Sequence, residues 1–215
     1  MVNGIYAAIK DPLPKNISIE KAIEDLSSRL PRHVLDLVDV IYVGDFEFLN
    51  KKNVNSTFLE NAIYATNVQT DQKDFLDDIV HEYAHAVEKN YDYQIYADGA
   101  IENEFLNKRN KLQVLLNYEG YPSDQHNFSN PDFDSAFDKF LYSEVGYEKL
   151  GNLGQNMFIG PYSVTSLSEY FATSFEEYYL NRRQLVKQMT PTIYTKLEII
   201  DKGKMEIYDE SHDYY

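Results

Sequence analysis

Residues 75–88 read Phe-Leu-Asp-Asp-Ile-Val-His-Glu-Tyr-Ala-His-Ala-Val-Glu, and this stretch decides how the chain is organised. Its apolar residues recur with the period of a helix. Four residues of helix turn through roughly 400°, so His81 and His85 project from nearly the same face, one turn apart. Two imidazoles at this separation can both ligate one Zn²⁺. Glu82 is poorly placed to ligate but close enough to act on a water molecule. The H-E-x-x-H pattern therefore predicts a catalytic zinc centre with Glu82 as general base.

The competing interpretation is a solvated helix face that happens to carry two histidines and a glutamate. The residues around the motif do not favour it, because apolar side chains lie on several sides of the helix (Ile79, Val80, Ala84, Ala86 and Val87). A helix of this kind is largely buried. Buried histidine and glutamate side chains need partners, and a metal ion supplies them.

A catalytic zinc ion usually has three protein ligands, so a third ligand is expected from a second helix. Residues 166–180 have helical spacing of their apolar side chains, and Glu169 falls in the first turn. Ser166 and Glu169 also form the S-x-x-E pattern of a capping box, in which Glu169 would bond the backbone of Ser166. The spacing leaves both roles open for Glu169.

Other possible ligands are less well placed. Glu176 and Glu177 lie roughly two turns further along the same helix. Three histidines, His33, His126 and His212, are isolated in the sequence, and we expect none of them to ligate. Glu88 follows His85 by three residues, so it is either a ligand-orienting carboxylate or an ordinary surface residue.

Composition narrows the function classes. The chain has 215 residues, enough for one large domain, and 43% of them are hydrophobic. A net charge of −15, from 35 acidic and 20 basic residues, argues against a nucleic-acid partner. This negative charge either keeps the protein soluble or suits a basic substrate. The count of 0 Cys excludes disulfides and thiolate zinc ligands. No apolar run is long enough to predict a membrane span, and the first residues lack the pattern of a secretory signal.

The N-terminal part predicts alternating strands and helices. Strands are expected over residues 5–9, 38–43 and 61–67. A helix capped by Ser18 is expected before Pro31, and a weak helical turn over residues 45–53. The metal helix is expected to start at Gln72, with Asp71 as its cap, and to end at about Asn90. A strand directly before the metal helix can hold an extended peptide by backbone pairing.

The remainder predicts mainly helices. One is expected over residues 98–116, a polar loop over 120–129, and a helix opened by Asn130 and Pro131 with its phenylalanines in the core. Four glycines between 146 and 160 indicate a lid or cleft-lining loop, or a plain connector. Residues 201–215 predict an acidic surface tail. The fold class expected is therefore α+β, with a small N-terminal mixed sheet and a mainly helical C-terminal part.

Two segments together resemble a known family. Residues 81–88, with His81, Glu82 and His85, are similar to the first motif of the anthrax lethal factor-like zinc metallopeptidases, which include the Pro-Pro endopeptidases. Residues 169–175 resemble the second motif of that family, with Tyr162 at the family's spacing seven residues before Glu169. Residues 178–181 look like the continuation in the Pro-Pro endopeptidases.

The resemblance implies a zincin-like fold of the gluzincin type and a single catalytic domain over residues 1–215. Its parts would be an α/β N-terminal part (1–74), the metal helix (75–90), a helical insertion (91–145), a lid loop with the third-ligand helix (146–200) and the tail (201–215). The insertion is expected because the interval from His85 to Glu169 is about twice that usual in the family.

The resemblance also implies the site. His81, His85 and Glu169 would bind Zn²⁺, Glu82 would be the general base, and the Tyr162 hydroxyl would stabilise the oxyanion. The expected function is a zinc-dependent endopeptidase acting on a protein or peptide substrate. From the charge and the missing signal pattern we expect no nucleic-acid or membrane partner, and a location in the cytoplasm or a particle rather than secretion. The family's proline specificity is not carried over, because of the insertion.

Two other functions stay open. One is a non-catalytic zinc-binding or interaction protein, for example in a virus particle, although such a site would need no base. The other is a zinc amidase that acts on a small substrate.

Overall fold

The computed structural model describes residues 3–180 and 182–204, and its chain divides into two compact units. The first comprises the described residues up to 92 together with those from 199 onward, and the second comprises residues 93–198. The fold is α+β, with a small mixed sheet in the first unit and a mainly helical second unit. The expected class and order of sheet and helices are confirmed. The single catalytic domain over 1–215 and the insertion over 91–145 stay predictions.

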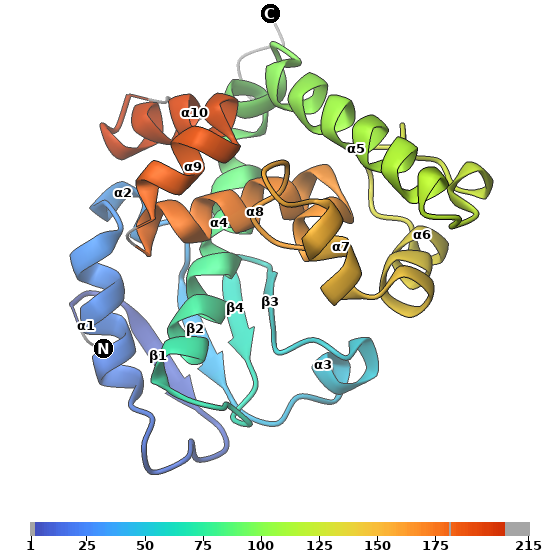
Figure 1. Cartoon of the computed structure of the whole chain (residues 1–215). Helices are drawn as coiled ribbons and strands as arrows, with labels where there is room; N and C mark the ends of the chain where they lie inside the picture. The colour runs from blue at the N-terminus through green and yellow to red at the C-terminus, as the bar shows by residue number, and fades with distance from the viewer. Residues whose placement is uncertain (1–2, 181, 205–215) are drawn as a thin grey trace, which may run out of the picture. The chain divides into compact units, whose positions relative to one another are not determined.

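The first unit is built on a sheet of strands in the order β1-β2-β4-β3 (Figure 1). The strands are β1 (Tyr6–Ile9), β2 (Val40–Val43), β3 (Ser56–Leu59) and β4 (Ala62–Ala65). β1, β2 and β4 run parallel, whereas β3 pairs antiparallel with β4 along the edge. Ile41 and Ile63 are paired and fully buried, so one face of the sheet lies in the core.

Strand β3 was not among the expected strands. It joins β4 through the two residues Glu60 and Asn61, both of which have positive φ, at 50° and 62°. This is the backbone of a tight hairpin turn, which usually carries glycine or Asn-Gly. The absence of glycine at these positions hid the hairpin from the sequence pattern.

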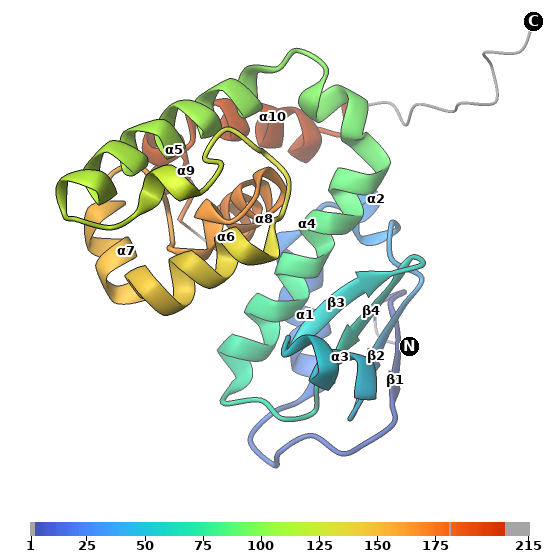
Figure 2. The ribbon, with the colours of Figure 1, turned by 90° about the vertical axis from the view of Figure 1, so that its right-hand side faces the viewer.

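Helices of the first unit cover the buried face of the sheet. They include α1 (Ile19–Arg29), α2 (Arg32–Leu35) and the larger part of α4 (Gln72–Tyr96), whereas Phe48 of α3 (Glu47–Lys52) contacts Tyr64 on the other face. Figure 2 shows α1 and α4 packed along the same side of the strands. Ser18 caps α1 by accepting a hydrogen bond from the Lys21 amide, as expected for a serine at this position.

Helix α4 carries the histidine motif. The Asp71 carboxylate accepts hydrogen bonds from the Lys73 and Asp74 amides at 2.7 and 3.0 Å, which confirms it as the cap. The helix is kinked at Tyr91, whose φ of −124° is not helical. The expected end near Asn90 therefore corresponds to the kink. The last turn, up to Tyr96, belongs to the second unit.

The second unit packs its helices around aromatic side chains. Its elements are α5 (Ala100–Tyr118), η1 (Ser123–Gln125), α6 (Ser135–Lys139), the π-helical η2 (Phe140–Val145), α7 (Tyr147–Leu153), η3 (Tyr162–Val164), α8 (Leu167–Tyr179), α9 (Arg183–Met189) and α10 (Pro191–Asp201), whose last turn belongs to the first unit. Phe105 of α5 lies 5.2 Å from the Tyr170 ring and 6.4 Å from the Phe158 ring. Tyr96 contacts Phe171 in the same way, at 6.3 Å.

The expected helix start at Asn130 and Pro131 is wrong. The Asn130 side chain accepts a hydrogen bond from the Asp132 amide, which closes a local turn, and the Pro131 carbonyl accepts from the Leu167 amide. Asp134 is the true cap, because it accepts from the Phe137 amide at 2.8 Å. Phe133 consequently lies outside the helix and is 55% exposed.

The glycine-rich segment between residues 146 and 160 is not a continuous loop. α7 runs through Gly151, so the expected loop is wrong for residues 147–153, while the role as a lid stays a prediction. The tail expected over 201–215 lies outside the described residues from 205 onward, as does His212, and Asn181 of the family resemblance is likewise outside them. Among the described helices, none combines the length and apolar content of a membrane span.

Candidate metal centre

His81 and His85 lie at the boundary between the buried and the open side of α4. Both are partly exposed, whereas Val80, Tyr83 and Ala84 beside them are fully buried. The two imidazole rings meet edge to face with their centres 5.1 Å apart. The helix therefore presents two imidazole rings side by side, one turn apart, as the spacing predicts.

Glu82 lies in the buried part of α4 and is 5% exposed. Its Oε1 accepts a hydrogen bond of 2.7 Å from the Ser56 hydroxyl on strand β3. A buried carboxylate without a donor is costly, and this hydroxyl provides one. The Glu82 carboxylate, next to His81 in the chain, is thus held in place by a hydrogen bond from Ser56.

Glu88 is placed to orient His85. Its Oε2 lies 3.3 Å from Nδ1 of His85, with both side chains largely buried. A proton on Nδ1 that is donated to Glu88 leaves the lone pair of Nε2 for a metal ion. This geometry supports the orienting role that the sequence left open.

Glu169 sits in the first turn of α8, in the second unit. Ser166 caps the helix, and its hydroxyl accepts a hydrogen bond of 3.1 Å from the Glu169 amide. The serine half of the capping box is therefore present. The backbone of Glu169 is fixed by this cap, and its side chain is half-buried.

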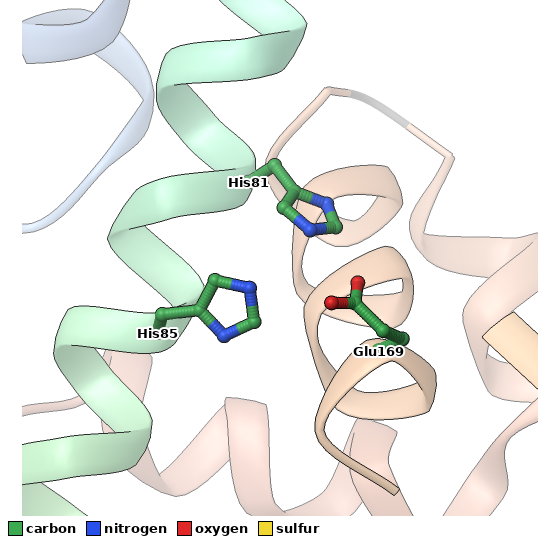
Figure 3. Close-up of side chains that lie close together, drawn as sticks. All are labelled: His81, His85 and Glu169. Atoms are coloured by element: carbon green, nitrogen blue, oxygen red, sulfur yellow. The ribbon is translucent and has the colours of Figure 1, made fainter. Parts of the chain in front are cut away.

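The side chains of His81, His85 and Glu169 come together (Figure 3). Each offers one ligand atom, and these atoms lie within 4.8 Å of one another, so the group could hold a metal ion. Among the described residues no other cluster of histidine and carboxylate side chains does so. His33 instead bonds the Ile200 carbonyl at 2.8 Å, and His126 stacks on Phe140. Both histidines were expected not to ligate.

The rival carboxylates on α8 are also outside this group. Glu177 pairs with Arg182 at 2.6 Å, and neither it nor Glu176 belongs to the cluster of ligand atoms found among residues 3–180 and 182–204. Glu169 was preferred over these two residues as the third ligand, and it is the carboxylate that the structure groups with His81 and His85.

Tyr162 opens the short helix η3, just before α8, and is 38% exposed. Its carbonyl accepts a hydrogen bond from the Thr165 hydroxyl at 2.8 Å, and Ser163 bonds the Gly160 carbonyl at 2.6 Å. The backbone around Tyr162 is therefore well fixed. Its role as an oxyanion donor stays a prediction.

Two residues near Glu169 were missed by the sequence reasoning. Burial raises the pKa of the Asp138 carboxyl, and the negative charge of Glu169 raises it further. Burial, followed by the charges of Asp138, Tyr142 and Glu169, raises the pKa of Tyr147 to about 12. No sequence signal singles out Asp138, because it is one of 35 acidic residues and belongs to no motif.

The three potential ligands supply two imidazole nitrogens and one carboxylate oxygen. This donor set fits Zn²⁺ with a position left for water, as in His₂Glu catalytic sites. The same donor types occur in non-haem iron(II) sites, so the donor atoms alone do not choose the metal. The buried carboxylate of Glu82 lies next to His81 in the chain and belongs to the same helix.

Comparisons with protein-family models, curated proteins and solved structures found no match.

Proposed function

We propose that this chain is a zinc-dependent endopeptidase that hydrolyses peptide bonds of a protein substrate. The observation that carries the proposal is the convergence of His81, His85 and Glu169, with the base Glu82 adjacent in the chain to one of the ligands. The resemblance of residues 81–88 and 169–175 to the lethal factor-like metallopeptidases agrees with it. No preference for proline is proposed.

The residues of the chain have separate tasks in this reaction. His81, His85 and Glu169 would hold Zn²⁺, which, when bound, polarises the scissile carbonyl and lowers the pKa of the attacking water. Glu82 takes the proton from that water and passes it to the leaving amine. The Tyr162 hydroxyl donates a hydrogen bond to the oxyanion of the tetrahedral intermediate.

The central test is Glu82→Gln, assayed with a peptide library on zinc-loaded protein. Gln keeps the shape of the side chain but cannot take a proton, so cleavage is expected to fall by at least about 10²-fold. Zinc content by elemental analysis should stay at the wild-type value, because Glu82 is not a ligand. Glu24→Gln, on the exposed side of α1, is the matched control and should leave both values unchanged.

Glu169→Ala completes the test, since it removes a proposed ligand and should lower zinc content and cleavage together. Wild-type protein that binds zinc and cleaves no peptide of the library would favour the non-catalytic alternative. Cleavage of small amides but not of peptides would favour the amidase.

A further inference from the structure

Ser56 of the edge strand β3 forms a hydrogen bond with Glu82, the proposed general base. Glu82 lies on α4 among buried apolar residues, and its carboxylate is 5% exposed. In the part of the chain that the structure describes, the Ser56 hydroxyl is the hydrogen-bond donor recorded for this carboxylate, at 2.7 Å. An ionised carboxylate in such surroundings depends on this donor.

Strand β3 holds Ser56 in a fixed register. Ser56 pairs with Ala65 of β4, and the two-residue turn at Glu60 and Asn61 sets that pairing. Side chains alternate between the faces of a strand, so Ser56 and Phe58 lie on the same face and Thr57 on the other. A slip of one residue would turn the Ser56 side chain to the other face of the sheet, away from Glu82.

A second contact ties the same face of β3 to α4. The Lys89 ammonium lies 5.5 Å from the centre of the Phe58 ring and donates a hydrogen bond of 2.9 Å to the Asn61 side chain. Lys89 follows Glu82 by two helical turns. Strand β3 and its turn thus contact α4 at a second place, away from the three potential metal ligands.

The terminal torsion of a glutamate is broad, so packing alone does not fix the direction of its two oxygens. A hydroxyl bonded to Oε1 fixes that direction and leaves Oε2 to accept the proton of the attacking water. Alignment of this kind determines how often a bound substrate is ready to react.

We propose that Ser56 is a positioning residue for the general base Glu82, acting from the edge strand of the sheet. This inference rests on the proposed function. The competing explanation is purely structural, in which Ser56 satisfies a buried carboxylate and affects stability alone. The two explanations differ in kcat and in the direction of the Glu82 side chain.

The experiment compares Ser56→Ala, Ser56→Thr and Thr57→Ala with wild type, all zinc-loaded. Ser56→Ala should lower kcat by about tenfold, with KM and zinc content unchanged, because a charge-assisted hydrogen bond is lost. Ser56→Thr keeps the hydroxyl and should restore kcat to within about threefold of wild type. Thr57→Ala, on the opposite face of the same strand, is the control and should match wild type.

A second readout does not depend on activity. Crystal structures of metal-free wild type and Ser56→Ala should show the Glu82 carboxylate in one direction in wild type and displaced or in several rotamers in the variant. An unchanged Glu82 in Ser56→Ala would overturn the inference, as would a variant with lower melting temperature and wild-type kcat. Inactive zinc-loaded wild type would instead refute the endopeptidase proposal, and the crystal structures would still decide the role of Ser56.

Discussion

Glu88 illustrates how one side chain can orient a proposed metal ligand. It faces Nδ1 of His85 across 3.3 Å, on the same helix and three residues further on. A carboxylate in this position fixes the tautomer and the orientation of the imidazole and makes its other nitrogen a better ligand. Such partners typically contribute 10- to 100-fold in metal affinity.

Glu88→Ala is therefore expected to weaken zinc binding by about 10- to 100-fold, measured by competition with a chelator. Glu88→Gln should fall between this variant and wild type, because it keeps an acceptor oxygen and loses the charge. Glu24→Gln serves as the control. Equal zinc affinity in Glu88→Ala and wild type would make Glu88 an ordinary surface residue.

Asp138 lies near Glu169, and the two negative charges repel each other. Its Oδ1 is buried and has no hydrogen-bond partner among the described residues, and its pKa is raised by burial and by the charge of Glu169. Two carboxylates near each other resist being ionised together. A cation bound by Glu169 would reduce this repulsion.

At the scale of elements, α5, α8 and α10 are joined by a polar network centred on Glu104. Its carboxylate accepts hydrogen bonds from the Tyr170 hydroxyl at 2.5 Å and from the Thr192 amide and hydroxyl at 3.1 and 2.6 Å. Lys108, one turn along α5, lies 3.3 Å away and bonds both the Tyr170 hydroxyl and the Met189 carbonyl. Tyr170 directly follows Glu169, so this network fixes the start of α8 within the second unit.

The same network makes stability depend on pH. Burial opposes the charge of Glu104, but the hydrogen bonds from Thr192 and Tyr170 and the charge of Lys108 outweigh it and lower the pKa of Glu104 below its ordinary value of 4.5. A lowered pKa means that the folded state binds the proton more weakly than the unfolded state. The stabilisation is present above about pH 4.5 and is lost as the pH falls through the lowered value.

Glu104→Gln should accordingly reduce the free energy of unfolding at pH 7 by about 2 kcal/mol, since hydrogen bonds to a charged group are lost. Its stability should also fall less steeply than that of wild type below pH 4.5. Urea unfolding at several pH values measures both effects. Glu102→Gln, exposed on the same helix, is the control, and parallel pH curves for Glu104→Gln and wild type would contradict this account.

At the scale of the whole molecule, the excess of acidic residues works against the folded state. A net charge of −15 on 215 residues creates self-repulsion that is strongest in the compact form. Screening reduces it, because the Debye length falls from about 30 Å at 0.01 M salt to about 10 Å at 0.1 M.

Raising NaCl from about 0.01 M to about 0.1 M should therefore increase the melting temperature of the metal-free protein by a few degrees, measured by circular dichroism. The same increase is expected with KCl, since the effect depends on ionic strength. A melting temperature that stays constant or falls would show that local ion pairs, such as Lys196 with Asp98, outweigh the general repulsion.

The sequence by itself determined the elements whose signals are local. Helical period and spacing placed His81 and His85 on one face of α4, and the caps Ser18, Asp71 and Ser166 follow from side chains that bond amides two or three residues away. The predicted helix start at Asn130 was wrong because a different side-chain hydrogen bond forms there. Asn130 closes a turn of its own, and Asp134 caps the helix in its place.

Tertiary structure decided everything that depends on pairing between distant segments. Only the fold puts Ser56 of β3 against Glu82, 26 residues away in the chain, and Asp138 near Glu169. The spacing in the sequence left Glu169 open between cap and ligand, and in the structure its carboxylate belongs with the two imidazoles to a group that could hold a metal ion. The physical reason is that helical period and capping act over a few residues. Strand pairing and the convergence of side chains depend on how the whole chain packs.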